Sequence, residues 1–414
     1  MIKRTLENYL LEAMEDTPVV AILGARQVGK STLAQKLIPL QVGQRITLDD
    51  NTTLQLANDD PVGLIRSLKT PALIDEIQKA PHLTSTIKMV VDENRGEGCL
   101  YVITGSADLR AVSSSKSHRH GKGDSMAGRV EWVTLHPLTQ AEIAGKESTF
   151  IDELVSGEFT EPSINLDLED IVNKIVTGGY PELQNRTPRR QRAWLKGYLN
   201  STIRSDLESV YNIRNSDEAL LLLKSLAVNI SGTLVKSNVQ KNLSIDRRTT
   251  DAYLSSLISC HIIDLLPAWH KNEGKALITA PKINFVDTAL VCSLRGINTT
   301  DLLNDRALLG DVFEAFVVTE FRRLANLHEL DIDTYHYRDA KGRVEVDLMI
   351  TVKNLSIGME IKAGSTYQSD WLKHLKKLID NKVIDRGVVI YTGDQQVHID
   401  EKIWLIPISK MLTF

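Results

Sequence analysis

The feature that most constrains the fold of this chain is a glycine-rich loop, Gly24-Ala25-Arg26-Gln27-Val28-Gly29-Lys30-Ser31. It follows the apolar run Val19–Leu23, which is typical of a buried parallel strand. The glycines allow the backbone to wrap around a phosphate with its N–H groups pointing inward. A glycine-rich turn without a ligand is the alternative, but a strand before the loop and a helix after it are the context that a phosphate-binding loop requires. The pattern therefore predicts a nucleotide site in an α/β domain.

Each position of this loop has an expected role toward a nucleoside triphosphate. A helix is expected to begin near Lys30, so that its positive dipole end faces the anion. The Lys30 ammonium would reach the β- and γ-phosphates, and the Ser31 hydroxyl would bind Mg²⁺. We therefore expect ATP and Mg²⁺ as cofactors, with the nucleotide held by Gly24, Ala25, Arg26, Gln27, Val28, Gly29, Lys30, Ser31 and Thr32.

Two adjacent acids, Asp75 and Glu76, follow a second apolar strand. Asp75 is expected to hold Mg²⁺, usually through water, and Glu76 to orient or deprotonate the attacking water. The second acid favours nucleotide hydrolysis over kinase chemistry, whereas the alternative is a strand that ends in a solvated acidic pair. Thr104 or Ser106, at the end of a further strand, is a candidate to hydrogen-bond the γ-phosphate or the water. An ordinary polar turn is the alternative there.

An arginine near the developing charge accelerates phosphoryl transfer by on the order of 10³ to 10⁵. Arg129, in Ala127-Gly128-Arg129-Val130, is the first candidate because it opens the fifth expected strand. Arg110 and Arg26 are weaker candidates, and a surface arginine without such a role is the alternative for each.

The bulk composition is that of a soluble globular protein of several domains, with 414 residues, 42% hydrophobic and 25% charged. A net charge of −4 excludes a chain that binds nucleic acid over its whole surface. The three cysteines are far apart and form no CxxC pair, which argues against a zinc site or a disulfide framework and fits a cytoplasmic location. The sequence shows neither a secretory signal nor an apolar run long enough to span a bilayer.

The pattern of apolar residues divides the chain into four parts. Residues 1–145 alternate strands and helices, which implies a parallel sheet covered on both faces. Residues 146–170 are acidic and contain hardly a basic side chain, which indicates a linker with a short helix. Residues 171–300 are helical, and 301–414 return to helices and strands as a separate α/β module. The stretch Ser113–Ser125 is rich in Ser, Lys, His and Gly, which predicts a mobile loop.

The helical part contains a stretch, Leu234 to Ala268, that resembles a winged helix-turn-helix. Leu234–Leu243 is expected as one helix, the next opens at Arg247, and Ile262–Leu266 is expected as a wing strand. In a DNA-binding module the first residues of the second helix meet the major groove, which makes Arg247, Arg248 and Thr250 the expected contacts. A packing or dimerisation module is the alternative.

The C-terminal module carries an ordered series of charged side chains. Asp347 lies in one expected strand, and Glu360 and Lys362 share one face of the next because they are two residues apart. Two carboxylates can bind a divalent metal, and a lysine can position water, so Asp347 and Glu360 are the candidate metal ligands. Glu314, on the preceding helix, could add a ligand. The series resembles the active site of restriction-endonuclease-like nucleases, whereas alternating charges on exposed strands are the alternative.

The whole chain resembles a prokaryotic family of AAA-type ATPases with a C-terminal region of unknown function. The resemblance rests on the loop already described, on the stretch Leu73–Gln78 that contains the acidic pair, and on several further stretches. These are Ile103–Ser106, Ala127–Val130, Gly178-Gly179-Tyr180-Pro181-Glu182, Phe285–Leu290 and the Glu314 to Lys362 series. It implies ATP binding, a winged-helix middle and an endonuclease-like end. The expected fold class is α/β, with an N-terminal P-loop NTPase sheet, a central helical winged-helix region and a C-terminal restriction-endonuclease-like module.

Three functions follow from these features. The first is an Mg²⁺-dependent ATPase that controls a DNA-engaging, nuclease-like C-terminal half. The second keeps the ATPase but makes the C-terminal module a catalytically inactive platform for protein or nucleic acid. The third is a switch in which ATP occupancy exposes a partner surface. Because AAA-type sites often lie between subunits, a homo-oligomer is also expected.

Overall fold

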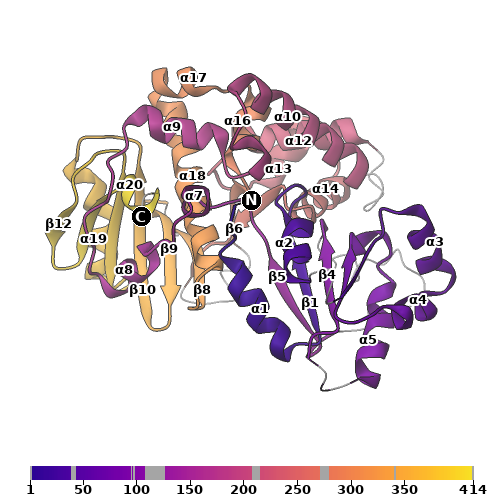
Figure 1. Cartoon of the computed structure of the whole chain (residues 1–414). Helices are drawn as coiled ribbons and strands as arrows, with labels where there is room; N and C mark the ends of the chain where they lie inside the picture. The colour runs from indigo at the N-terminus through magenta and orange to yellow at the C-terminus, as the bar shows by residue number, and fades with distance from the viewer. Residues whose placement is uncertain are drawn as a thin grey trace.

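The computed structural model describes residues 2–38, 43–94, 96, 98–107, 126–207, 215–270, 279–339 and 342–412. Figure 1 shows an N-terminal sheet with its helices, a group of helices above it, and a C-terminal sheet on the other side of the long helix α18 (Arg306–Asn326). The predicted mobile loop Ser113–Ser125 and the candidate Arg110 lie outside the described residues. Within the described ranges no helix has the length and apolar character needed to cross a membrane.

The N-terminal sheet is parallel throughout, as predicted. Its strands run in the order β2-β3-β4-β1-β5. They are β1 (Val19–Leu23), β2 (Gln44–Thr47), β3 (Ala72–Asp75), β4 (Tyr101–Gly105) and β5 (Val130–Thr134). The strands β1 and β4 are buried along their whole length, because helices cover both faces of a parallel sheet.

Alternate residues of β1 supply two separate cores. Val20 and Ile22 pack with α1 (Leu6–Asp16) and α2 (Lys30–Leu37) on one face. Val19, Ala21 and Leu23 pack on the other face with α3 (Asn51–Asp59), α4 (Pro61–Ser67) and α5 (Leu83–Glu93). The two-residue period of a strand explains this division, and it leaves the carboxyl edge of the sheet open for a site.

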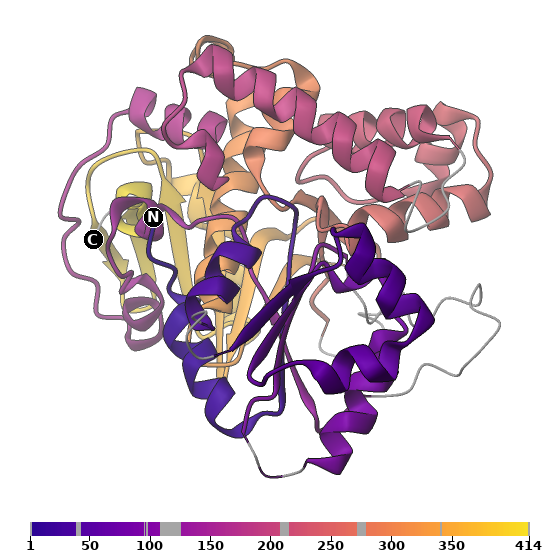
Figure 2. The same ribbon diagram turned by 45° about the vertical axis from the view of Figure 1, so that its right-hand side comes forward.

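The helical middle begins at α9 (Leu168–Thr177) and is drawn above the sheet in Figures 1 and 2. Two short 3₁₀ and π segments, η2 (Pro181–Leu183) and η3 (Thr202–Leu207), flank its longest helix. Its other elements are α10 (Pro188–Ser201), α12 (Ser216–Val228), α13 (Lys236–Leu243), α14 (Arg247–Ser259), β6 (Ile263–Leu266), β7 (Lys282–Phe285), α16 (Thr288–Arg295) and α17 (Thr299–Asn304). The strands β6 and β7 pair antiparallel, so the region is not purely helical.

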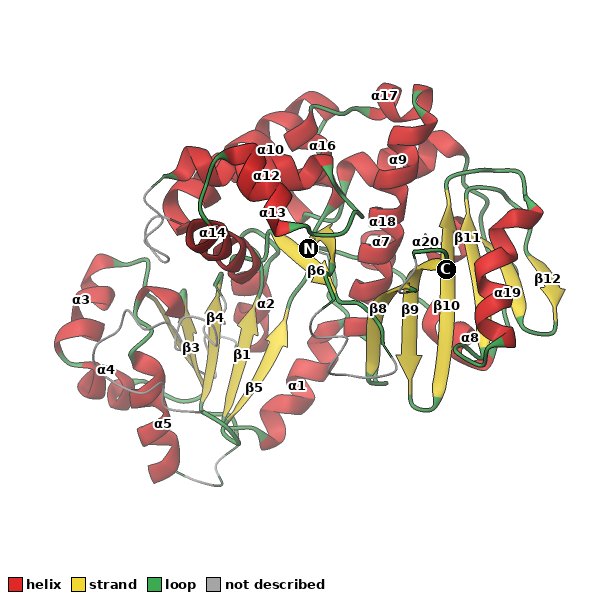
Figure 3. Cartoon of the chain, turned by 180° about the vertical axis from the view of Figure 1, so that it is seen from behind, coloured by secondary structure: helices red, strands yellow, loops and turns green. Residues whose placement is uncertain are grey.

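The C-terminal module is a mixed six-stranded sheet with the order β12-β13-β11-β10-β9-β8. The strands are β8 (Ile332–Arg338), β9 (Glu345–Val352), β10 (Leu355–Lys362), β11 (Arg386–Tyr391), β12 (Val397–Asp400) and β13 (Ile403–Pro407). The helix α18 covers one face and α19 (Lys373–Asp380) the other, as seen from behind in Figure 3. Short helices η4 (Ser369–Leu372) and α20 (Ile408–Leu412) complete the module.

The acidic segment 146–170 packs along the C-terminal sheet. Its helix α8 (Phe150–Ser156) buries Phe150 and Leu154. The Glu153 carboxylate accepts from Lys410 Nζ at 2.8 Å, and the backbone oxygen of Val155 accepts from Arg386 at 2.9 Å. The basic partners of this acidic segment therefore lie more than 230 residues away in the sequence.

A buried polar network joins the three parts of the chain. Arg323 on α18 pairs with Asp287, with 2.7 Å between Nη2 and Oδ2, and also donates to the backbone oxygen of Leu138 at 3.0 Å. Asp287 accepts from the Gly179 backbone N–H at 2.7 Å. Because Gly178-Gly179 and Asp287 both belong to stretches that carry the family resemblance, their pairing gives those stretches a physical role in joining the domains.

Glu320, one turn before Arg323 on α18, makes the buried polar network between the domains sensitive to pH. It is 1% exposed and accepts from the backbone N–H of Gln140, in α7 (Gln140–Ala144), at 2.6 Å. Burial raises the pKa of Glu320 to about 7, against the opposing charge of Arg323. The folded state therefore holds an extra proton between the ordinary carboxyl pKa and about 7, so stability falls as pH rises through that window.

We expect Glu320→Gln to remove this pH dependence. The amide keeps an acceptor for the Gln140 N–H but never ionises. Relative to the wild type, the variant should gain roughly 2–3 kcal/mol of unfolding free energy between about pH 4.5 and pH 8. Urea unfolding at several pH values measures the difference, and Glu329→Gln on the surface is the control. A constant difference between the two proteins at all pH values would contradict the assignment.

Candidate functional site

The loop between β1 and α2 has a backbone that depends on its glycines. Gly24 has φ of 148° and Gly29 has φ of 98°, a range that side chains rarely adopt. A Cβ at Gly24 would lie 2.2 Å from the backbone oxygen of Leu135. Even alanine would therefore displace the loop from the end of β5, and the glycine spacing seen in the sequence has a steric cause.

Lys30 and Ser31 sit at the start of α2, directly after this loop. Lys30 is buried, and its Nζ donates to the backbone oxygens of Gly24 at 3.0 Å and Ala25 at 2.9 Å. The ammonium thus lies inside the loop. Ser31 Oγ donates to Asp75 Oδ1 at 2.9 Å. Hydroxyl and carboxylate oxygens are the ligands that Mg²⁺ prefers, so this pair fits the ion.

Asp75, Glu76 and Thr104 come together because β3 and β4 are parallel neighbours whose carboxyl ends share one edge. Thr104 Oγ1 donates to Asp75 Oδ1 and accepts from the Glu76 backbone N–H at 3.3 Å. Glu76 has φ of 60°, a left-handed conformation that costs energy in a residue other than glycine. Strain of this kind is found most often at functional sites.

A glutamine that sequence reasoning did not single out, Gln78, supports the acidic pair. Its Nε2 donates to Glu76 Oε2 and to Ser106 Oγ, the latter at 2.8 Å. Ser106 Oγ in turn lies 3.4 Å from Glu76 Oε2. Thr104 and Ser106, the two candidates from the sequence, therefore contact different acids: Thr104 contacts Asp75, and Ser106 contacts Glu76. Gln78 lies two residues after Glu76 and ends the stretch Leu73–Gln78 that carries the family resemblance, which was the signal for it in the sequence.

Lys30, Ser31 and Glu76 line a cavity of about 1030 Å³ at the carboxyl edge of the sheet. The lining residues are Arg26, Gln27, Gly29, Lys30, Ser31, Thr32, Asp49, Glu76, Lys79, Pro181, Glu182 and Arg204. Of the expected loop residues, Ala25 and Val28 are instead buried under the loop, and Val28 is tied to Arg4 through its backbone oxygen at 2.7 Å. The volume is large enough for a nucleotide.

The arginines are placed differently from the expectation. Arg129 precedes β5, and its backbone oxygen accepts from the N–H of Val19 at the start of β1. It lies at the amino edge of the parallel sheet, opposite the cavity, where its Nε pairs with Asp92 at 2.7 Å. Arg129 therefore lies away from the cavity of its own chain, and its role as a catalytic arginine stays a prediction. Arg26 does line the cavity, as does Arg204 on η3, which sequence reasoning missed.

The second helix of the expected helix-turn-helix begins at Arg247, as predicted. Asp246 caps it by accepting from the Thr249 N–H at 3.0 Å. Arg247 and Arg248 are exposed. Thr250 is fully buried, and its Oγ1 donates to the backbone oxygen of Asp246 at 2.9 Å. Thr250 was an expected DNA contact, but it faces the protein interior because it lies on the inner side of α14.

The C-terminal candidates do gather at one place. Asp347 on β9 and Glu360 on β10 are buried, and Asp347 Oδ2 accepts from the Ile361 backbone N–H at 2.8 Å. Lys362 Nζ lies 3.7 Å from Glu360 Oε1. Glu314 on α18 belongs to the same cluster, since the charge of Asp347 is among the causes that raise its pKa.

A lysine from another part of the chain occupies this cluster. Lys282, on β7, is 4% exposed, and its Nζ lies 2.9 Å from Glu314, 3.1 Å from Glu345 and 3.7 Å from Asp347. Burial alone would lower the pKa of Lys282, but these carboxylates raise it above its ordinary value. Sequence reasoning missed Lys282 because it lies about 30 residues before the nearest member of the series.

Burial and mutual repulsion shift the pKa values of the carboxylates in this cluster. Burial and then the charge of Asp347 raise the pKa of Glu314 to about 8, and the same two causes raise the pKa of Glu360 well above its ordinary value. Among the described residues, no three His, Cys, Asp or Glu side chains are arranged to hold a metal ion. The Lys282 ammonium lies 3.7 Å from Asp347, inside the predicted metal site, and the role of Asp347 and Glu360 as metal ligands stays a prediction.

Comparison with known families divides the chain into three matched regions. Residues 16–144 match an AAA domain, and residues 168–301 and 309–411 match two domains of unknown function, DUF8612 and DUF4143. The parallel sheet and the loop of the first region have the P-loop NTPase fold. The match supports an AAA-type P-loop ATPase domain in residues 16–144.

Similar whole proteins have names that state no function. The uncharacterized proteins Rv2008c of Mycobacterium tuberculosis and Mb2031c of Mycobacterium bovis are each 25% identical over 99% of this chain and 85% of their own length. Among solved structures, the Walker-type ATPase PABY2304 of Pyrococcus abyssi is 14% identical, with a TM-score of 0.44 over 71% of this chain and 96% of its own. The RuvB Holliday junction branch migration motor of Thermotoga maritima is 16% identical, with a TM-score of 0.32 over 67% and 95%.

Proposed function

We propose that the chain is an Mg²⁺-dependent ATPase with Glu76 as the residue that activates water. The observation that carries this is the convergence of Lys30, Ser31, Asp75 and Glu76 at one edge of one sheet, beside a cavity of nucleotide size. When bound, ATP with its metal ion supplies a polarised γ-phosphate. Hydrolysis further requires that the phosphates be positioned, that their negative charge be offset, and that a base activate water. This chain has a side chain for each of these tasks.

The residues have separate tasks in this proposal. Lys30 lies inside the loop, where its charge offsets that of the phosphates. Ser31 and Asp75 are held together by their hydrogen bond and offer oxygen ligands for the ion. Glu76 is oriented by Gln78 and by its own backbone conformation, so that its carboxylate can accept a proton from water. Arg26 and Arg204 line the same cavity and are the cations available to stabilise the transition state.

Lys30→Ala tests the site directly. Removing a buried ammonium from the loop should weaken ATP binding at least 100-fold, because no other lysine replaces it inside the loop. Isothermal titration with ATP and Mg²⁺ measures the affinity. Lys36→Ala on the exposed end of the same helix, where Lys36 pairs with Glu7, should bind ATP like the wild type. Equal affinities in the wild type and Lys30→Ala would refute the assignment.

We propose that the ATPase domain controls the rest of the chain. The domains are residues 1–145, 171–300 and 301–414, with 146–170 as the connecting segment that packs on the last of them. The helices α13 and α14 followed by the β6–β7 pair have the order of a winged helix, and the exposed Arg247 and Arg248 support DNA contact. In this first form, the C-terminal module is nuclease-like and uses Asp347, Glu360 and Lys362.

One observation favours the second form, an ATP-dependent switch with a catalytically inactive C-terminal platform. Lys282 fills the carboxylate cluster with an internal cation, at 2.9 to 3.7 Å from three acids. Because β7 lies in the middle region, this lysine also ties the winged-helix part to the C-terminal sheet. A movement of the middle region would break these ion pairs. A change in the bound nucleotide that moves this region would therefore alter the C-terminal module.

A further inference from the structure

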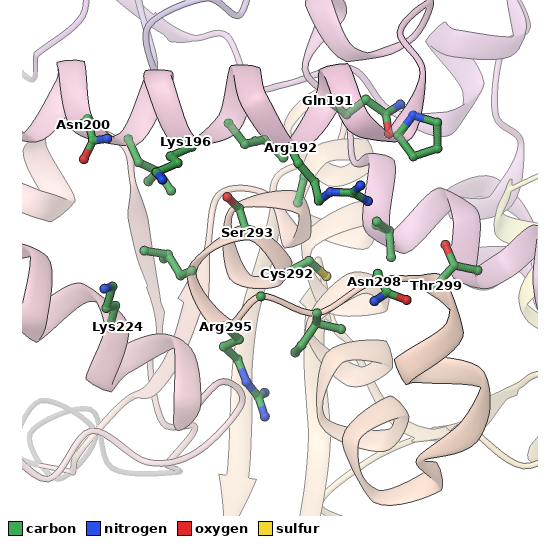
Figure 4. A pocket seen from close by; sticks show the side chains of 18 of the residues that line it. Gln191, Arg192, Lys196, Asn200, Lys224, Cys292, Ser293, Arg295, Asn298 and Thr299 are labelled. Carbon is green, nitrogen blue, oxygen red and sulfur yellow. The ribbon is translucent and has the colours of Figure 1, made fainter.

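A second cavity, of about 570 Å³, lies within the helical middle and away from the carboxylate cluster. Three helices form its walls: α10 on one side, with α12 and α16 facing it. Figure 4 shows Arg192 and Lys196 extending from α10, and Cys292 and Ser293 on α16 opposite. The volume is within the range of pockets that enclose a small organic ligand, roughly 300 to 1000 Å³.

The floor of this cavity is apolar. Leu195 and Leu199 of α10 are 3% and 5% exposed, and Ile297, after α16, is 8% exposed. Val176 and Leu220 complete the apolar surface. A floor of this kind binds the hydrocarbon part of a ligand by removing it from water.

The rim of the cavity is positively charged. Arg192 and Lys196 on α10 and Lys224 on α12 are exposed at its mouth. In the described part of the chain, none of the three forms a salt bridge, and no Asp or Glu lines the cavity. Arg295 also lines it but is directed away from α10 in Figure 4 and interacts with the charge of Asp311. The mouth thus carries cations that no carboxylate of the cavity offsets.

We propose that this cavity binds a small amphipathic anion, with an apolar body on the floor and a carboxylate or phosphate head at Arg192, Lys196 and Lys224. The floor and the rim each select one half of such a ligand. A nucleic acid strand would use the cations but leave the apolar floor empty. An acidic protein segment would use both, but a cavity of about 570 Å³ has the size of a small-molecule site.

The cavity is connected to the nucleotide site through α10. Gln191 and Leu195 face the cavity, whereas Trp194 and Tyr198, on another side of the same helix, line a separate space of about 310 Å³ together with Arg26 of the nucleotide loop. The segment η3 follows α10 directly and carries Arg204 into the nucleotide cavity. A ligand that holds α10 therefore acts on two arginines of the nucleotide site, so we assign the anion a regulatory role. This role rests on the proposed ATPase function, whereas the binding itself does not.

Fluorescence titration of the full chain with 1-anilinonaphthalene-8-sulfonate, an amphipathic anion, tests the binding. We expect saturable binding that dodecanoate displaces and dodecyltrimethylammonium, a cation with the same tail, displaces at least 10-fold less well. The double variant Arg192→Glu/Lys196→Glu should lose at least 10-fold in affinity for both anions. Lys241→Glu, an exposed charge reversal on α13, is the matched control and should bind like the wild type.

Three results would overturn the proposal: no saturable binding, equal displacement by the anion and the cation, or equal affinity in the double variant at an unchanged melting temperature. Displacement by an acidic amphipathic peptide but not by dodecanoate would overturn it in favour of a protein partner. ATPase rates with and without dodecanoate then test the regulatory role. An inactive wild type would count against the ATPase proposal only, and the binding result would stand.

Discussion

Glu76→Gln should bind ATP normally and hydrolyse it at least 100-fold more slowly than the wild type. The amide cannot take a proton from water, and general base catalysis is typically worth 10² to 10⁴ in rate. The substitution keeps the shape of the side chain and an acceptor for the Gln78 amide. It also leaves Ser31, Asp75 and Lys30 in place, so affinity for the nucleotide should not change.

A single-turnover ATPase assay, combined with a binding titration, separates these two effects. Glu182→Gln is the matched control, because Glu182 lines the same cavity but is exposed and pairs with Arg186. Its hydrolysis rate should equal that of the wild type. If Glu76→Gln hydrolyses ATP at the wild-type rate, another group activates the water. If it fails to bind ATP, Glu76 has a structural role instead.

Much of the N-terminal half could be predicted because its signals are local in the sequence. Val19–Leu23 is apolar at every position because helices cover both faces of the sheet. The next residue, Gly24, has to be a glycine because a Cβ there would collide with the backbone of Leu135. The prediction that Arg129 lies at the nucleotide site did not take into account the direction of the strand that follows it. A residue before a parallel strand lies at the amino edge of the sheet, whereas the nucleotide site lies at the carboxyl edge.

The residues that could not be predicted reach their positions through tertiary contacts between distant segments. Arg204 enters the nucleotide cavity from the helical middle, and Lys282 enters the carboxylate cluster from β7. Neither has a motif around it, since an isolated cation in a sequence is most often a surface residue. Thr250 is a further example. Its position near the start of α14 suggests contact with the DNA major groove, but its side chain is buried in the protein.

Lys282→Met should destabilise the chain by about 3–5 kcal/mol. The methionine keeps the length of the side chain but leaves Glu314, Glu345 and Asp347 without their shared cation, and an uncompensated buried charge is costly. Lys362→Met removes a cation from the same cluster whose side chain is 31% exposed, so it should cost less. Urea unfolding of the two variants and the wild type at pH 8 measures the difference.

The same variant separates the two forms of the proposed function. If Lys282 takes the place of a metal, Mn²⁺ should raise the melting temperature of Lys282→Met and leave that of the wild type unchanged, because the freed carboxylates then need a cation. The wild type should also fail to cut plasmid, linear or single-stranded DNA with Mg²⁺ or Mn²⁺. Cutting by the wild type that is lost in Asp347→Ala and Glu360→Ala would instead establish the nuclease. Lys282 would then have to leave the cluster before metal could enter, so each catalytic cycle would begin with a movement of β7.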